Sequence, residues 1–321
     1  MTDPLQTIID RVTQDHSIAA ADIATLRGMV WGKPELVDAD MRMLAEINRH
    51  IKIPSPDFTD FFAEAIVHFT LRQTEPKYFL KDHLAEWLEE RLIHDGRLGS
   101  YTELETLVRI LEQAENAPER FKRWTLAEIE RSILTGQGPT RLGGNISPGV
   151  VDTDDAKYLR RTLFARAGFG ALAVTVEEAE MLFRIKDTTK DSLNAPEWDA
   201  LFVQAAANFI QAHVGRAMLT EADKARLERV MDENRPHIGR FLGRMGDMSN
   251  LAQTLGFGEK PRDLDAEIAE ASQITPSEAG WLRSQIAADK RTDRYEKALL
   301  AFLSDEAGGL PDALEHLRAA G

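Results

Sequence analysis

The sequence contains no cysteine among its 321 residues. This absence excludes disulfide bonds, thiolate catalysis, iron–sulfur clusters and cysteine-ligated zinc. There is also no uninterrupted apolar run of the roughly 20 residues that a membrane helix needs, so no stable membrane insertion is expected. The opening MTDPLQTIID lacks a basic stretch followed by an apolar one. It therefore predicts a protein without a secretory signal, located in the cytoplasm.

Basic residues are outnumbered, with 39 Lys and Arg against 53 Asp and Glu, and the formal net charge is −14. A surface of this sign repels phosphate backbones unless its basic residues cluster. The basic residues form no long blocks, because apolar or acidic residues separate them. We therefore expect no binding to nucleic acid.

The familiar catalytic and metal-binding motifs are missing as well. The eight histidines include no H-x-x-x-H pair and no H-E-x-x-H, and there is no EF-hand loop, phosphate-binding loop or G-x-S-x-G elbow. No catalytic residue and no cofactor-binding residue is predicted. An enzyme of an unrecognised type stays open as an alternative.

Helical periodicity dominates what is present. Apolar residues recur with the i, i+3, i+4, i+7 spacing of one helical face in residues 59–71, at Phe61, Phe62, Ala65, Ile66 and Phe69. A second such stripe lies in residues 103–114, at Leu104, Leu107, Val108 and Leu111. Alternation typical of a strand appears only briefly, around Ala173–Val176. The chain is therefore predicted to be all-α.

Helix starts are marked by capping boxes, in which a cap side chain and a glutamate three residues later satisfy free backbone N–H groups. The pattern occurs at Ser100–Glu103, Thr175–Glu178, Thr275–Glu278 and Asp293–Glu296. These positions predict four helix beginnings.

A glycine- and proline-rich stretch divides the chain almost in half. The stretch TGQGPTRLGGNISPG, residues 135–149, carries five glycines and two prolines. We therefore expect an N-terminal helical module at 1–134, a linker at 135–152, and a C-terminal helical module at 153–321. The last would carry an inserted segment at about 214–272.

The two halves resemble each other in sequence. Pro56, Phe62, Ala65 and Phe69 recur in the same order as Pro196, Phe202, Ala205 and Phe209, and Trp87-Leu88 recurs as Trp281-Leu282. Prolines and tryptophans matched in a fixed order are harder to obtain by chance than matched apolar residues. An internal duplication with one shared core plan is therefore predicted.

Asp95-Gly96, followed a few residues later by Glu103 and then by Leu107, resembles a turn of the TerB-like family of all-helical modules linked to bacterial tellurite resistance. In that turn an Asp-Gly pair and a few variable residues precede E-x-x-x-L. The resemblance implies an all-α fold, a role in stress response or complex assembly, and binding of a divalent cation through surface carboxylates. The metal-ligand candidates are Asp95, Glu103, Asp289 and Glu296. The competing interpretation is that both glutamates close capping boxes.

The inserted segment contains the other candidate site, a run of arginine, methionine and apolar residues typical of adaptable partner-binding surfaces. The candidates are Arg240, Phe241, Arg244, Met245 and Met248. The alternatives are a helix that covers the second core and contact with a membrane surface. The preferred hypothesis is a non-enzymatic helical adaptor or stress-associated scaffold that acts through protein partners, and assembly into a homo-oligomer is compatible with it.

Overall fold

The computed structural model describes residues 4–94, 97–141, 147–167, 173–218, 274, 276–286, 292–306 and 310–319. Helices make up most of these residues, so the all-α prediction is confirmed. The strands among them are β1 (Ile93–His94) and β2 (Arg97–Leu98), an antiparallel pair that no sequence pattern predicted. None of the described helices combines the length and apolarity that crossing a membrane requires.

The chain divides into two compact units. The first comprises Met1–Leu172 and Glu180–Leu201, and the second comprises Ala173–Ala179 and Phe202–Gly321. Helices α9 (Val176–Thr189) and α10 (Pro196–Met218) contribute residues to both units. The sequence boundaries at 1–134, 135–152 and 153–321 stay predictions.

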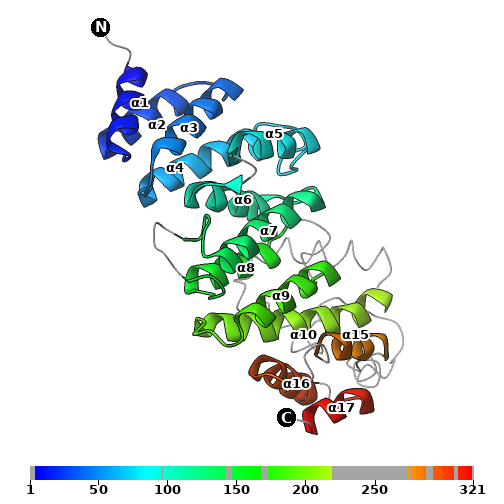
Figure 1. Cartoon of the computed structure of the whole chain (residues 1–321). Helices are drawn as coiled ribbons and strands as arrows, with labels where there is room; N and C mark the ends of the chain where they lie inside the picture. Colours follow the sequence, from blue (N-terminus) through cyan, green and yellow to red (C-terminus); the bar gives the residue numbers. More distant parts are fainter. Residues whose placement is uncertain are drawn as a thin grey trace. The chain divides into compact units, whose positions relative to one another are not determined.

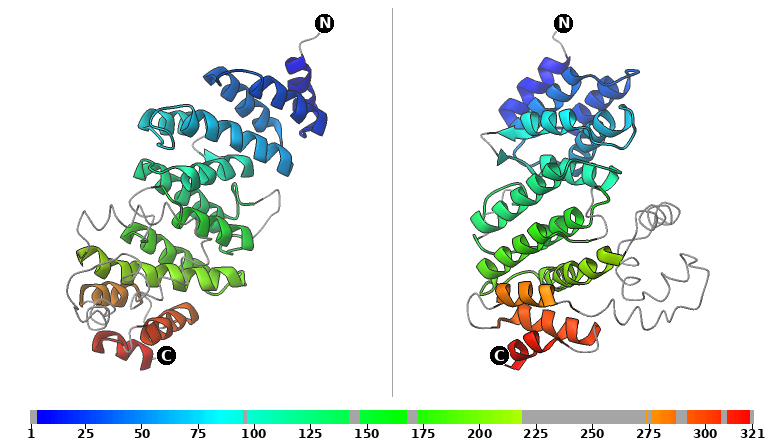
Figure 2. Two further views of the ribbon diagram at one scale, coloured as in Figure 1. Left: turned by 180° about the vertical axis from the view of Figure 1, so that it is seen from behind. Right: turned by 90° about the vertical axis from the view of Figure 1, so that its right-hand side faces the viewer.

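The first unit is a succession of helices in which each packs on near neighbours along the chain (Figures 1 and 2). The closely packed pairs include α1 with α3, α2 with α4, α3 with α5, α4 with α6, and α6 with α8. Their bounds are α1 Pro4–Asp15, α2 Ala20–Trp31, α3 Asp38–His50, α4 Pro56–Val67, η1 His68–Arg72, α5 Asp82–Leu92, α6 Tyr101–Gln113, α7 Glu119–Thr135 and α8 Thr153–Leu163.

Helix α4 begins at Pro56, which fills the first helical position, and the Ser55 hydroxyl accepts a hydrogen bond from the backbone N–H of Phe58 at 3.3 Å. Its predicted apolar stripe is confirmed, because Phe61, Phe62 and Ile66 are fully buried. The helix predicted over 59–71 is an α-helix only as far as Val67, and from His68 it continues as the π-helix η1. There the backbone N–H of Gln73 donates to the His68 carbonyl, five residues back.

Helix α7 ends at Thr135, and the following Gly136 caps it in a left-handed conformation with φ of 68°. The N–H of Gly136 donates to the Ser132 carbonyl and closes the last turn. Within the predicted linker, Arg141 is buried. Its guanidinium donates to the carbonyls of Ser132 and Val150 and to the carboxylate of Asp152. The side chain therefore holds the described part of this segment against the helices on either side.

The second unit contains α15 (Pro276–Ile286), α16 (Arg294–Glu306) and α17 (Asp312–Ala319), together with parts of α9 and α10. Its core includes two aromatic contacts: Phe202 lies 5.7 Å from Tyr295 and Phe209 lies 4.6 Å from Trp281, measured between ring centroids. The predicted inserted segment lies outside the described residues from residue 219 onward.

Residues that match across the two halves of the sequence also pair in space. Phe69 contacts Trp87 in the first unit at 5.3 Å, and their matches Phe209 and Trp281 contact each other in the second. Phe62 and its match Phe202 are both fully buried. The duplication stays a prediction, and these equivalent contacts support it.

Candidate functional site

Glu103, one of the four predicted metal ligands, closes the capping box at the start of α6. Its Oε2 accepts hydrogen bonds from the backbone N–H groups of Gly99 at 2.9 Å and Ser100 at 3.0 Å, and its Oε1 accepts one from Asn48 Nδ2 at 3.0 Å. Burial raises the pKa of Glu103 to about 7, although these hydrogen bonds favour the ionised form. The predicted capping box is confirmed, whereas its metal partner, Asp95, lies outside the described residues.

Glu296 plays the same part at the start of α16. The backbone N–H of Asp293 donates to Glu296 Oε2 at 2.9 Å, and the N–H of Glu296 donates to Asp293 Oδ1 at 3.0 Å. A matching pair of bonds joins Thr175 and Glu178 at the start of α9. Asp289 lies outside the described residues, so a divalent-cation site at these carboxylates stays a prediction.

The candidate partner-binding residues of the inserted segment also lie outside the described residues. They are Arg240, Phe241, Arg244, Met245 and Met248. The described residues of the first unit nevertheless contain two clusters of charge that the sequence did not single out.

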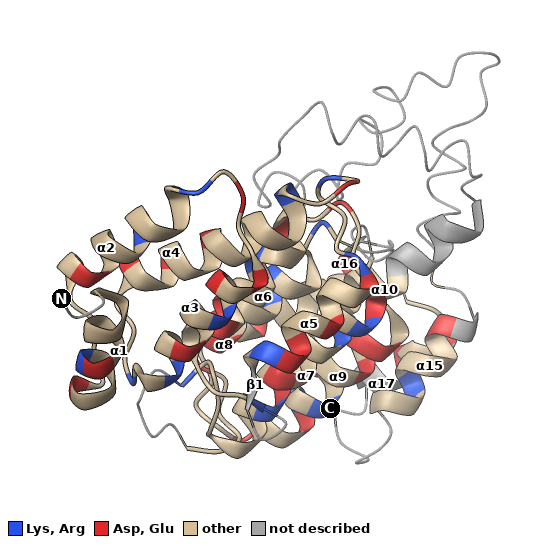
Figure 3. Ribbon diagram, turned by 90° about the horizontal axis from the view of Figure 1, so that it is seen from above, with Lys and Arg blue, Asp and Glu red and all other residues tan. Residues whose placement is uncertain are grey.

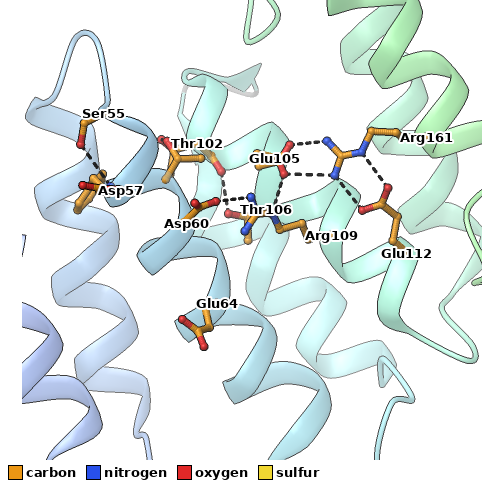
Figure 4. Close-up of polar contacts among 12 residues, drawn as sticks. Ser55, Asp57, Asp60, Glu64, Thr102, Glu105, Thr106, Arg109, Glu112 and Arg161 are labelled. Carbon is orange, nitrogen blue, oxygen red and sulfur yellow. Dashed lines mark hydrogen bonds and ion pairs between the residues drawn. The ribbon is translucent and has the colours of Figure 1, made fainter.

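The first cluster is a charged network across α4, α6 and α8, drawn in Figure 4. Arg161 of α8 donates to Glu105 at 2.6 Å and to Glu112 at 2.8 Å, so that one guanidinium joins two carboxylates of α6. Arg109 contacts Glu105 and reaches Asp60 of α4. These five residues, together with Tyr158, are called the charged network below.

Glu105 is the centre of the charged network. It also accepts the hydroxyl of Tyr158 at 2.6 Å. Burial opposes ionisation of Glu105, but hydrogen bonds from Arg161, Tyr158 and Arg109 outweigh it, so the pKa of this carboxyl is lowered. The network therefore consists of mutually paired ions, an arrangement that fixes helices relative to one another.

The second cluster lies on α3 and the last turn of α5. A groove there is called the arginine groove below. It is lined by Ala39, Arg42, Met43, Ala45, Glu46, Arg49 and Arg91. On the described helices, acidic and basic residues are interspersed (Figure 3). The arginine groove differs from this pattern, because three arginines line it beside one glutamate.

Arg49 joins the two helices of the arginine groove. It forms an ion pair with Glu46 at 2.8 Å, and its Nη2 donates to the backbone carbonyl of Arg91 at 3.5 Å. Arg42 pairs with Asp38 one turn earlier on α3. Both ion pairs are substantially exposed, so they stabilise the fold little.

Arg91 is the cation of the arginine groove that forms no ion pair with a described residue. Its Nε is buried and has no hydrogen-bond acceptor among the described residues. The carboxylate of Asp38, which feels the charge of Arg91, is already held by Arg42 and by the Trp87 indole N–H at 2.5 Å. These two hydrogen bonds, more than the charge of Arg91, lower the pKa of Asp38 against its partial burial.

The sequence contained one signal for the arginine groove. Arg42 and Arg49 are seven residues apart, which places them on one face of a helix two turns from each other. The third arginine comes from α5, and nothing in the local pattern predicts that α5 packs against α3.

Comparison with protein-family models, with curated proteins and with solved structures finds no match to this chain. A function therefore has to be supported by the geometry of the described residues.

Proposed function

We propose that the protein is a non-enzymatic helical scaffold that acts through protein partners. The observation that carries the proposal is the packing of the first unit, in which each helix contacts near neighbours along the chain. Helical proteins built in this way, such as α-solenoids, use their extended surfaces to bind other proteins.

The charged side chains of the first unit support the proposal. Glu105 is shared among Arg109, Arg161 and Tyr158, so it serves packing and carries no free charge for acid–base chemistry. The arginine groove, by contrast, is open to solvent and keeps a cation without an ion-pair partner among the described residues. Positive charge that lines an open groove suits recognition of a partner.

Site-specific cross-linking tests the proposal. A photo-activated cross-linking residue replaces Glu46 in the arginine groove or Lys157 beside the charged network, and a control replaces exposed Gln6 of α1. We expect protein adducts of defined mass from Glu46 or Lys157 and none from Gln6. Absence of adducts at both test positions, or the same adducts at all three, would contradict a partner-binding scaffold.

The segment around Arg240 is tested in the same experiment. A chain that lacks residues 230–260 is cross-linked in parallel with the full chain. Loss of adducts would assign the docking surface to that segment, and an identical set of adducts would remove it as the docking surface.

A further inference from the structure

We propose that the arginine groove binds an extended acidic segment of a protein partner, with two carboxylates three residues apart. The inference rests on the proposed function and specifies the chemistry of the partner. Two observations support the inference, namely the charges of the groove residues and the spacing between them.

The local charge favours an acidic ligand. Three guanidinium groups, those of Arg42, Arg49 and Arg91, stand against two carboxylates, those of Asp38 and Glu46. The groove is thus locally positive on a chain whose net charge is −14. Such a site attracts an acidic partner that the rest of the surface repels.

The spacing favours an extended segment with separated carboxylates. Arg42 and Arg49 are seven residues apart on α3, which corresponds to about 10 Å along the helix axis. A peptide in the extended polyproline II conformation has three residues per turn and advances about 3.1 Å per residue, so side chains three residues apart lie on one face, about 9 Å from each other. Glu46 lies between the two arginines and would repel a single compact anion placed midway.

The hydrogen-bonding capacity of the groove is incompletely used. A carboxylate that approaches Arg42 or Arg49 competes with exposed ion pairs, whose loss costs at most about 1 kcal/mol each. Arg91 adds a third guanidinium to the lining of the groove, and it forms no ion pair with a described residue. Arginine binds carboxylates with two parallel hydrogen bonds, which gives directional recognition of an acidic side chain.

The uncharged part of the groove accommodates the residues between the two carboxylates. Ala39, Met43 and Ala45 line it alongside the arginines. Short and apolar side chains leave room for a peptide backbone, and a methionine adapts its shape to different neighbours. The intervening residues of the ligand can therefore vary, whereas the two acids cannot.

Fluorescence anisotropy with the full chain and labelled synthetic peptides tests the proposal. The probe is a Ser/Thr-rich peptide with glutamates three residues apart. One matched peptide carries glutamine at both positions, and another carries adjacent glutamates. We expect the first peptide to bind at least about tenfold more tightly than either control, since each carboxylate–arginine contact contributes on that order. Inorganic phosphate serves as competitor and is expected to displace the peptide only weakly.

Three variants locate the binding site. Arg42→Gln with Arg49→Gln is expected to weaken binding about tenfold or more, because both peptide carboxylates lose their partners. Glu46→Gln is expected to tighten binding, because it removes the acid that lines the groove. Arg166→Gln with Arg184→Gln is the matched control: both arginines are exposed and pair with carboxylates outside the groove, Glu115 and Glu130, and their joint loss changes net charge as much as the double variant of the groove does. Far-UV circular dichroism confirms that each variant is folded.

The outcomes separate the two proposals. The acidic-segment inference would be overturned if Arg166→Gln with Arg184→Gln weakened peptide binding as much as the groove variant does, or if the glutamine peptide bound as tightly as the glutamate peptide. It would also be overturned if Glu46→Gln weakened peptide binding, or if phosphate displaced the peptide completely. If the peptides fail to bind while cross-linking at Lys157 captures a protein, the scaffold function stands and the inference falls. If cross-linking captures nothing, the scaffold function falls whatever the peptides do.

Discussion

The guanidinium of Arg141 forms an ion pair with the carboxylate of Asp155, with 2.8 Å between Nη2 and Oδ2. Their side chains are 2% and 0% exposed, so both charges have left water. Arg141 belongs to the glycine- and proline-rich segment, and Asp155 lies in the first turn of α8. The pair therefore ties a segment without regular structure to the beginning of a helix.

Arg141→Ala is expected to destabilise the protein by about 3–5 kcal/mol, because it leaves the buried Asp155 carboxylate without its counter-ion. Urea unfolding followed by circular dichroism measures the effect. Arg184→Ala serves as control: its ion pair with Glu130 is more exposed, and its loss should cost at most about 1 kcal/mol. Equal losses in the two variants would show that burial of the Arg141 pair has no consequence.

Glu103 predicts a pH dependence of stability. Its pKa rises from 4.5 to about 7 on folding, so the folded state binds the proton more tightly than the unfolded state. The protonated Glu103 therefore contributes fully to the free energy of unfolding below pH 4.5, and this contribution is lost as pH rises through 7. The free energy of unfolding falls by about 3 kcal/mol over this range because of Glu103.

Glu103→Gln should remove this part of the pH dependence, because an amide stays neutral. Its oxygen can accept the backbone N–H groups of Gly99 and Ser100, and rotation of the Asn48 amide offers an acceptor for its NH₂. The free energy of unfolding of both proteins is measured from pH 4.5 to pH 8. If the free energies of unfolding of the two proteins changed with pH in parallel, Glu103 would not be the source of the pH dependence.

Tyr158→Phe isolates one hydrogen bond of the charged network, because the ring stays and only the hydroxyl is removed. The lost bond to Glu105 joins a buried donor to an ionised acceptor, so we expect a loss of about 1.5–3 kcal/mol. Chemical denaturation measures it. A stability equal to that of the parent protein would mean that Arg109 and Arg161 alone satisfy Glu105.

Phe62→Ala and Phe202→Ala test the predicted duplication. Both side chains are fully buried at matched positions, so each substitution should cost about 3–5 kcal/mol. Hydrogen exchange read by mass spectrometry should show faster exchange around α4 in the first variant and around α10 in the second. Very different losses of protection would indicate that the two positions do not share one core plan.

Local sequence patterns predicted the features of the fold that depend on residues close along the chain. The apolar stripe at Leu104, Leu107, Val108 and Leu111 is fully buried, and the capping boxes at Glu103, Glu178 and Glu296 all form. In each case the residues that interact lie within one or two helical turns, so periodicity and capping chemistry suffice to identify them.

The same patterns could not identify the candidate site. Arg91 joins Arg42 and Arg49 only because α5 packs against α3, and Arg161 reaches Glu105 across 56 residues of sequence. Arg141 likewise looked like part of an open linker until its distant acceptors were known.

The sequence alone determined that this chain is helical, where several of its helices begin and which of their faces are apolar. Only the tertiary structure decided which charges are paired and where three arginines meet. The physical reason is the range of the interactions: backbone capping and helical periodicity act within a turn or two, whereas ion pairing depends on which helix faces pack together.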